Sequence, residues 1–76
     1  MRKRKGLPKK EPTVGERIKA ARTQRGLSQE ELGELLSVYR VVISDWERSK
    51  TMPTIKSVRR IARALDCRMV ELVGER

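Results

Sequence analysis

The 76-residue sequence predicts an all-α fold, a compact bundle of five short helices that follows a basic arm. From Thr13 onward the apolar residues recur at helical spacing, and no stretch shows the alternation of a strand. One small core is all that the chain can build, because a domain of about 60 residues buries only ~60% of its unfolded surface. We therefore expect a binding surface rather than an enclosed catalytic pocket.

The first two helices are each expected to begin at a capping box. Thr13 with Glu16, and Ser28 with Glu31, have the spacing at which each side chain satisfies the other residue's backbone amide. Gly26 supplies a left-handed stop for the first helix. The residues expected to face the core are Val14, Ile18 and Ala21 in the first helix, and Leu32, Leu35 and Leu36 in the second, which ends near Leu36.

Three more helices complete the predicted bundle. A third helix is expected over about 39–48, because Pro53 prevents much continuation. Thr54 can cap a fourth helix, and a last short helix is expected over 69–73. The residues expected to face the core are Ile43 and Trp46 in the third helix, Ile55, Val58, Ile61, Ala62 and Leu65 in the fourth, and Met69 and Leu72 in the fifth.

The positive charge is concentrated at the start of the chain. The sequence has 19 Lys plus Arg against 10 Asp plus Glu, a net charge of +9. Six of these cations, Arg2, Lys3, Arg4, Lys5, Lys9 and Lys10, lie in the first ten residues. This stretch also holds Gly6 and Pro8 and a single aliphatic residue, so burial cannot offset the entropy of ordering it. We expect residues 1–12 to form a flexible basic arm and residues 13–76 to form one domain.

Several classes of function are disfavoured by composition. The chain has no His and only one Cys, so acid–base catalysis by His, a thiolate metal cluster and an internal disulfide are not expected. The longest apolar run, 41–43, is far shorter than the ~18 residues of a membrane span. We expect a cytoplasmic protein that is not an enzyme and has no metal, cofactor or membrane partner. Cys67 is expected to be a small buried hydrophobe.

The second helix, a turn at about 37–39 and the third helix have the lengths of a helix-turn-helix. With them the sequence has Gly26-Leu27-Ser28-Gln29-Glu30-Glu31-Leu32, then Val38, Ile43 and Trp46-Glu47, then Pro53 and Ala64-Leu65. On these residues the stretch from Val14 to about Val73 resembles the lambda-repressor-like DNA-binding domains of phage repressors and Cro proteins and of the wider bacterial helix-turn-helix family. The resemblance implies a sequence-specific double-stranded DNA binder, a transcriptional regulator of repressor or controller type, usually a homodimer on a two-fold symmetric operator.

The outer face of the third helix is the expected reader of base edges. At about 100° per residue, Ile43 and Trp46 fall on one side of the helix, and the other side carries Val41, Ser44, Asp45 and Arg48. The expected base-reading residues are Arg40, Val41, Ser44 and Asp45. A guanidinium can bind guanine O6 and N7, a valine can pack on a thymine methyl, and a carboxylate can accept from cytosine N4 or orient an arginine. The alternative is that Arg40 and Arg48 are solvated surface charges with no contact to DNA.

The resemblance also implies contacts with the DNA backbone. It assigns this role to Gln29 at the start of the second helix and to the segment after the third helix, where the candidates are Arg48, Ser49, Lys50 and Thr51. The arm residues Arg2, Lys3, Arg4 and Lys5 are further candidates for DNA contact. Arg22 and Glu47 match an internal ion pair of the family, to which we assign a structural role.

Three residues depart from the family pattern. Ser37 and Ser49 stand where glycine is common, and a left-handed backbone at either costs roughly 1 to 2 kcal/mol, so we expect a strained or a different turn at each. Tyr39 replaces the usual Ser or Thr cap of the third helix and cannot cap in that way. Its phenol can either hydrogen-bond a phosphate or cover the edge of the core.

Other interpretations remain open at this point. The fourth helix carries a basic face of Lys56, Arg59, Arg60 and Arg63, which is either solvated or contacts nucleic acid or an acidic partner. Val70 and Val73 are candidates for a dimer contact. The chain can also be an antitoxin, which binds DNA and a protein partner, or an RNA-associated factor. The absence of Phe argues against the last, because single-strand recognition relies on aromatic stacking.

Overall fold

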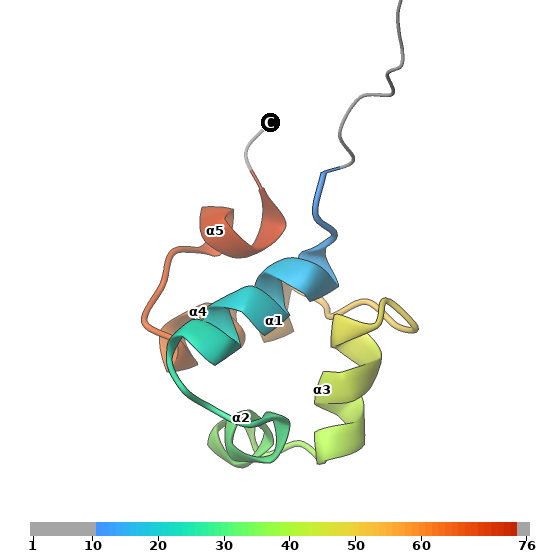
Figure 1. Cartoon of the computed structure of the whole chain (residues 1–76), viewed down its shortest axis with the longest axis vertical. Coiled ribbons are helices and arrows are strands. Elements are labelled where there is room, and N and C mark those ends of the chain that lie inside the picture. Colours follow the sequence, from blue (N-terminus) through green and yellow to red (C-terminus); the bar gives the residue numbers. More distant parts are fainter. Residues whose placement is uncertain (1–10, 75–76) are drawn as a thin grey trace, which may run out of the picture.

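The computed structural model describes residues 11–74, which contain five helices and no strand. The helices are α1 (Val14–Gln24), α2 (Gln29–Leu36), α3 (Arg40–Glu47), α4 (Ile55–Ala64) and α5 (Met69–Val73). Figure 1 shows α1 running through the middle of the bundle, with α2 below it, α3 to one side and α5 above. The predicted all-α fold and its order of elements are confirmed. None of these described helices has the length and apolar character needed to cross a membrane.

The capping hydrogen bonds predicted at the helix starts are present. Thr13 and Glu16 form a complete capping box, with both backbone-to-side-chain distances at 3.0 Å. Ser28 and Glu31 form the second box, at 2.8 and 3.0 Å. Thr54 Oγ1 accepts from the Ser57 amide and caps α4. Of the predicted arm, residues 1–10 lie outside the described part of the chain, and residues 11 and 12 belong to no helix.

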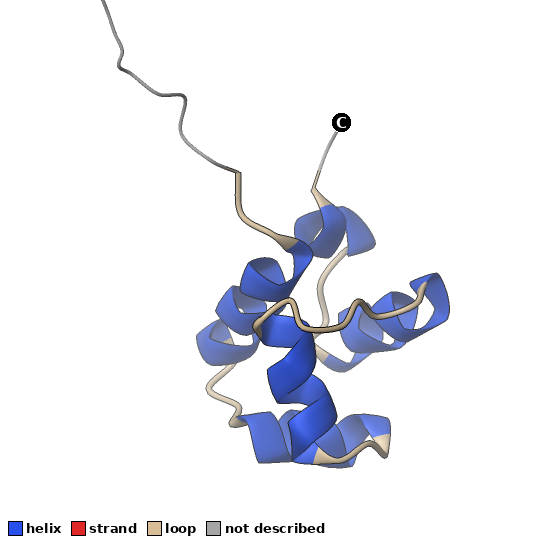
Figure 2. Ribbon diagram, turned by 90° about the vertical axis from the view of Figure 1, so that its right-hand side faces the viewer, coloured by secondary structure: helices blue, strands red, loops and turns tan. Residues whose placement is uncertain are grey.

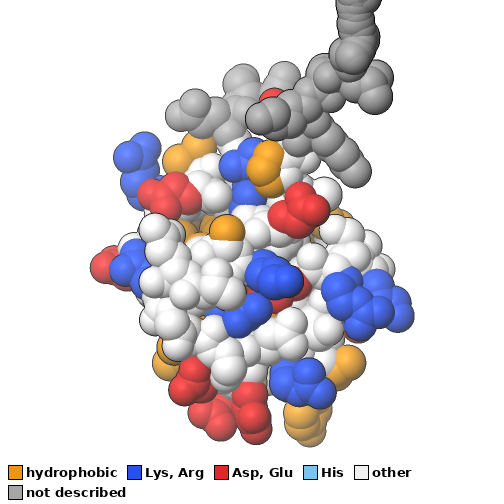
Figure 3. All heavy atoms as spheres, in the orientation of Figure 1, with side chains coloured by type: hydrophobic (Ala, Val, Ile, Leu, Met, Phe, Trp, Pro, Cys, Tyr) orange, Lys and Arg blue, Asp and Glu red, His pale blue; other side chains and the backbone are white. Residues whose placement is uncertain are grey.

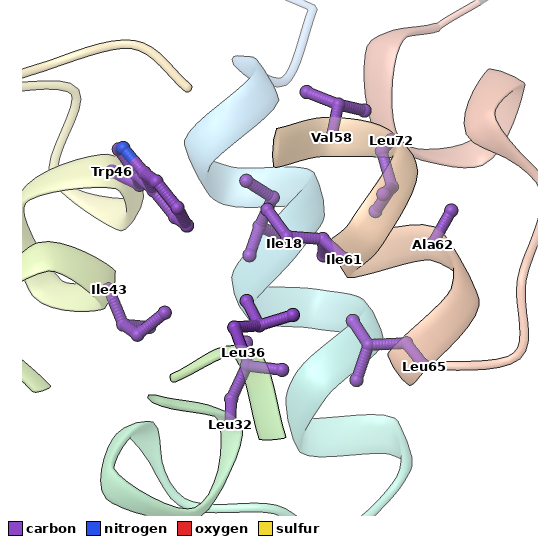
Figure 4. Packing of buried hydrophobic residues seen from close by; sticks show 10 residues of the cluster. All are labelled: Ile18, Leu32, Leu36, Ile43, Trp46, Val58, Ile61, Ala62, Leu65 and Leu72. Atoms are coloured by element: carbon purple, nitrogen blue, oxygen red, sulfur yellow. The ribbon is translucent and has the colours of Figure 1, made fainter. Parts of the chain in front are cut away.

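All five described helices contribute to one apolar core, shown in Figure 4. Its buried members are Ile18, Leu32, Leu36, Ile43, Trp46, Val58, Ile61, Ala62, Leu65 and Leu72. Val14, Ala21 and Met69 pack against them and are half-buried. Trp46 and Ile43 reach inward from α3, as the helical spacing predicts. The core therefore fixes which face of α3 is left for solvent.

Two residues expected in the core lie outside it. Leu35 is 57% exposed and Ile55 is 64% exposed. Leu35 falls at the side of the stripe that Leu32 and Leu36 make, where it borders an open hollow shared with α4 and is not covered. Ile55 is the first residue of α4 and extends past the end of the core. Both assignments were wrong because helical spacing gives a direction but not the extent of the neighbouring helix.

Cys67 follows its prediction only in part. The side chain packs against the core but is half-buried rather than fully buried. Burial raises the pKa of the Cys67 thiol, and the Glu71 carboxylate adds to this effect. The thiol is therefore held in its neutral, apolar form.

Gly15 lets the backbone of α1 contact the carboxyl end of α3. A Cβ at this position would lie 2.1 Å from the Trp46 carbonyl oxygen and 2.8 Å from that of Glu47. Gly33 has a similar role, because a Cβ there would lie 2.7 Å from the Val38 carbonyl oxygen. Sequence reasoning missed both residues, although a glycine inside a helical pattern is a recognised sign of close packing.

We expect Gly15→Ala to lower the free energy of unfolding by about 1 to 3 kcal/mol, because backbone atoms must separate to admit the methyl group. This is the net decrease, after the ~1 kcal/mol that alanine contributes as the better helix former has been subtracted. Thermal and urea denaturation measure it. Lys19→Ala, at an exposed position of the same helix, is the control and should change stability by less than about 0.5 kcal/mol. A Gly15→Ala protein as stable as wild type would contradict the close contact.

Candidate nucleic-acid interface

The turn between α2 and α3 contains a left-handed serine. Ser37 has φ 60° and ψ 41°, and the amide of Val38 donates to the Gly33 carbonyl at 2.9 Å. Ser49, after α3, has φ 64°. Of the two alternatives, a strained turn or a different one, both serines have the left-handed backbone, at a cost of roughly 1 to 2 kcal/mol each. These two residues set where α3 begins and where the chain leaves it.

Helix α3 has one buried and one exposed side. Ile43, Trp46 and Glu47 are buried, whereas Arg40 and Arg48 are exposed and Val41 is 58% exposed. Ser44 and Asp45 are half-buried. Figure 2, which views the molecule from the side of α3, shows this helix in front with α2 at its lower end. The predicted base-reading residues thus lie along an accessible edge of the fold.

The structure excludes one of the two roles considered for Tyr39. No side-chain hydrogen bond caps α3 at this residue, as predicted. Its side chain is 82% exposed, so the proposal that it covers the edge of the core is wrong. The residue before it in the turn, Val38, supplies that cover instead and packs against the core. The phenol of Tyr39 is left facing solvent beside the start of α3.

Arg22 and Glu47 form the predicted ion pair. The guanidinium binds the carboxylate through two contacts, Nε to Oε2 at 2.6 Å and Nη2 to Oε1 at 3.0 Å. The side chains are only 9% and 2% exposed. Arg22 Nη1 also donates to the Leu27 carbonyl at 2.7 Å. One arginine therefore joins α1, the loop before α2 and the end of α3, and the paired geometry compensates for the burial of both charges.

Gln29 connects this buried pair to the start of α3. Its Nε2 donates to Glu47 Oε1 at 3.0 Å, and its Oε1 accepts from Arg40 Nη1 at 3.5 Å. Because the amide donates to the carboxylate on one side, its oxygen faces the guanidinium on the other. Sequence reasoning assigned Gln29 to phosphate contact and missed this link. No sequence signal indicated it, because the contact depends on the distance between the two helices.

Backbone hydrogen bonds tie the segment after α3 to the end of that helix. The amides of Lys50 and Thr51 both donate to the Asp45 carbonyl, at 2.9 and 3.4 Å. Arg48, Ser49, Lys50 and Thr51 are all exposed. The three cations Arg40, Arg48 and Lys50 thus lie at the two ends of α3, with Val41, Ser44 and Asp45 between them. Figure 3 shows cationic side chains spread over the visible face, with a group of acidic ones at the lower edge, over α2, and other acidic side chains higher up.

The fold and this motif are those of a helix-turn-helix protein. The sequence pattern of the helix-turn-helix family matches residues 18–72, and the chain belongs to this family. The immunity repressor protein of Bacillus phage phi105 is 38% identical over 63 residues, which are 83% of this chain and 44% of that repressor. Repressor protein C2 of Salmonella phage P22 is 41% identical over 54 residues, 71% of this chain and 25% of that repressor. The chain spans less than half the length of either relative.

A solved structure of the P22 c2 repressor in complex with a synthetic operator has the same fold. The TM-score is 0.78 at 36% sequence identity, and the match covers 84% of this chain and 97% of that chain. The predicted resemblance to phage repressors is confirmed by these relatives.

We expect Glu47→Ala to lower the free energy of unfolding by about 3 to 5 kcal/mol, because it leaves the Arg22 guanidinium buried without a partner. Urea denaturation measures the decrease. Removing both charges in R22M/E47L should recover much of it, since no uncompensated charge remains. Glu30→Ala, at an exposed position of α2, is the control for removal of a carboxylate. A Glu47→Ala protein no less stable than Glu30→Ala would contradict a structural role for the pair.

Proposed function

We propose that the protein binds double-stranded DNA sequence-specifically and acts as a small transcriptional regulator of repressor or controller type. The observation that carries this proposal is the fold shared with a repressor solved on its operator, over nearly the whole of that chain. The exposed side of α3 supports it, because an α-helix fits the major groove and this one presents a cation and polar groups there. The relatives named above are repressors and give no support to the antitoxin alternative.

The proposed base-reading residues are Arg40, Val41, Ser44 and Asp45. Arg40 is exposed at the first position of α3, from where its guanidinium can bind the two acceptors of a guanine. Val41 offers an apolar surface for a thymine methyl, and Ser44 can donate or accept. Asp45 can accept from the amino group at cytosine N4, and its carboxylate is unsuited to a backbone contact because phosphate repels it.

The proposed backbone contacts surround this face. Gln29 and Tyr39 lie near the amino ends of the two helices, and Arg48, Lys50 and Thr51 follow α3. The arm residues Arg2, Lys3, Arg4 and Lys5 are proposed to add sequence-independent affinity. Cations that neutralise phosphates release counterions, so these contacts give affinity that falls with salt.

We further propose a homodimer on a two-fold symmetric operator, in the cytoplasm and with the nucleoid when bound. A domain of this size reads a short half-site, and two copies double the number of base pairs read. Val70, which is half-buried, and Val73, which is 42% exposed, are the proposed contact between copies.

Arg40→Ala and Lys50→Ala should have different effects although each removes one positive charge. We expect Arg40→Ala to weaken the preferred operator by roughly 1 to 3 kcal/mol and to relax selectivity at one or two base pairs of each half-site. Lys50→Ala should weaken all duplexes about alike. The measurement is binding-site selection from a random duplex pool, repeated for the wild type and both variants. Identical selected motifs from all three would contradict base reading by Arg40.

Deletion of residues 1–10 should weaken binding to every duplex, because it removes six positive charges. The slope of log affinity against log salt should flatten by about 0.9 for each phosphate that the arm no longer neutralises. Titrations at several salt concentrations, with operator and with random duplex, measure the slope. An unchanged slope would mean that the arm does not bind DNA.

A further inference from the structure

A hollow with an apolar floor lies between α2 and α4. Its volume is about 240 Å³, and the residues that line it are Leu35, Leu36, Arg60, Arg63 and Ala64. Three of these residues are apolar, two are cationic and none is acidic. Leu35 is 57% exposed, so part of the apolar lining is in contact with water. The residues proposed to contact DNA are not among those that line the hollow.

The two arginines at the hollow differ in what they bind. Arg60 donates to the carbonyl oxygen of Leu36, the last residue of α2, and so joins the two helices at this place. Arg63 is exposed and takes part in no ion pair within residues 11–74. Its planar guanidinium can therefore bind an anionic group from another molecule, through two parallel hydrogen bonds.

The exposed side of α4 adds to this positive charge. Its cations, which recur at spacings of three and four residues, are Lys56, Arg59, Arg60 and Arg63. The sequence has no acidic residue between Glu47 and Asp66, and no ion pair in the described part of the chain neutralises these cations. Like charges at this spacing repel one another. An anionic partner that lies along α4 would relieve the repulsion at several positions together.

We propose that the α2/α4 surface, which is the hollow together with Lys56 and Arg59, binds an acidic amphipathic segment of a partner protein. One bulky apolar side chain of the segment fills the hollow, where it and Leu35 leave water. A carboxylate beside that side chain binds Arg63. A second carboxylate, about one helical turn away, binds Arg59, because residues four apart on a helix are neighbours. A single anchor residue in a pocket can carry much of the energy of such a contact.

The lining of the hollow favours a protein segment over other occupants. A duplex presents phosphates at its outer surface and would leave the apolar lining uncovered, whereas a peptide can carry an apolar side chain and carboxylates together. A free small molecule is disfavoured by size, because sites for such ligands begin at ~300 Å³. In addition, α4 packs against α2 and α5. The contact leaves the exposed residues of α3 free and does not depend on DNA binding.

The test begins with a library of random dodecapeptides displayed on phage, selected for binding to the 76-residue chain. We expect the recovered peptides to share a bulky apolar residue flanked by Asp or Glu. Fluorescence polarisation with labelled synthetic peptides then measures their affinity for variants of the chain. Arg63→Glu should weaken binding by about tenfold or more, because hydrogen bonds between charged groups are lost. Leu35→Ser should also weaken binding, without lowering the melting temperature, because this side chain lies outside the core.

Charge exchange separates contact with Arg63 from general attraction to a chain of net charge +9. A peptide whose flanking acid is replaced by Lys should bind the Arg63→Glu protein more tightly than the wild type. Arg63→Gln removes the charge without placing a carboxylate at the end of α4, and it should weaken the original peptides too. Lys19→Glu makes the same change of charge as Arg63→Glu at an exposed position of α1 and should leave their affinity unchanged.

Three outcomes with the peptides would overturn the proposal. The first is that no peptide is recovered, the second that the recovered peptides are acidic but share no apolar residue, and the third that Arg63→Glu and Lys19→Glu weaken them alike. Random duplex DNA is the second probe. Arg63→Glu should bind it as Lys19→Glu does. A larger loss of duplex affinity for Arg63→Glu would make the basic side of α4 a nucleic-acid contact and would also overturn the proposal.

Discussion

The buried contact of Arg22 with Glu47 is the interaction on which the arrangement of the helix-turn-helix depends. Glu47 is the last residue of α3, Arg22 lies in α1, and the same guanidinium holds the Leu27 carbonyl ahead of α2. Gln29 then extends the network to Arg40 at the other end of α3. The apolar core sets the rotation of α3 about its axis, but apolar packing is not directional. The charged pair fixes the position of the helix along that axis, and with it the positions of the exposed side chains.

The sequence predicted the elements well because their ends carry local signals. The capping boxes at Thr13 and Ser28 need only four consecutive residues each, so they can be recognised without knowledge of the fold. Leu35 and Ile55 were misplaced for the opposite reason. Whether an apolar residue at the edge of a stripe is covered depends on the length and angle of a helix distant in sequence, which spacing alone does not give.

The candidate site was predictable in its members but less so in its connections. The exposed face of α3 follows from the burial of Ile43 and Trp46, and the pairing of Arg22 with Glu47 came from the resemblance to phage repressors. The position of the Gln29 amide between a carboxylate and a guanidinium could not be foreseen, because it depends on the distance between two helices. Tyr39 likewise had two possible roles, and only its exposure in the structure, which the sequence does not give, excludes the one in which it covers the edge of the core.

At Gly15, α1 contacts the main chain of α3 and not the side chains that α3 exposes to solvent. At this point α3 is contacted through its main-chain carbonyls, and its inward side chains are Ile43, Trp46 and Glu47. None of these contacts involves Val41 or the aliphatic part of Arg40. Val41, which takes no part in these contacts, is therefore free to diverge among descendants of this chain while the scaffold stays the same. Arg40 is constrained more, because its guanidinium also contacts Gln29.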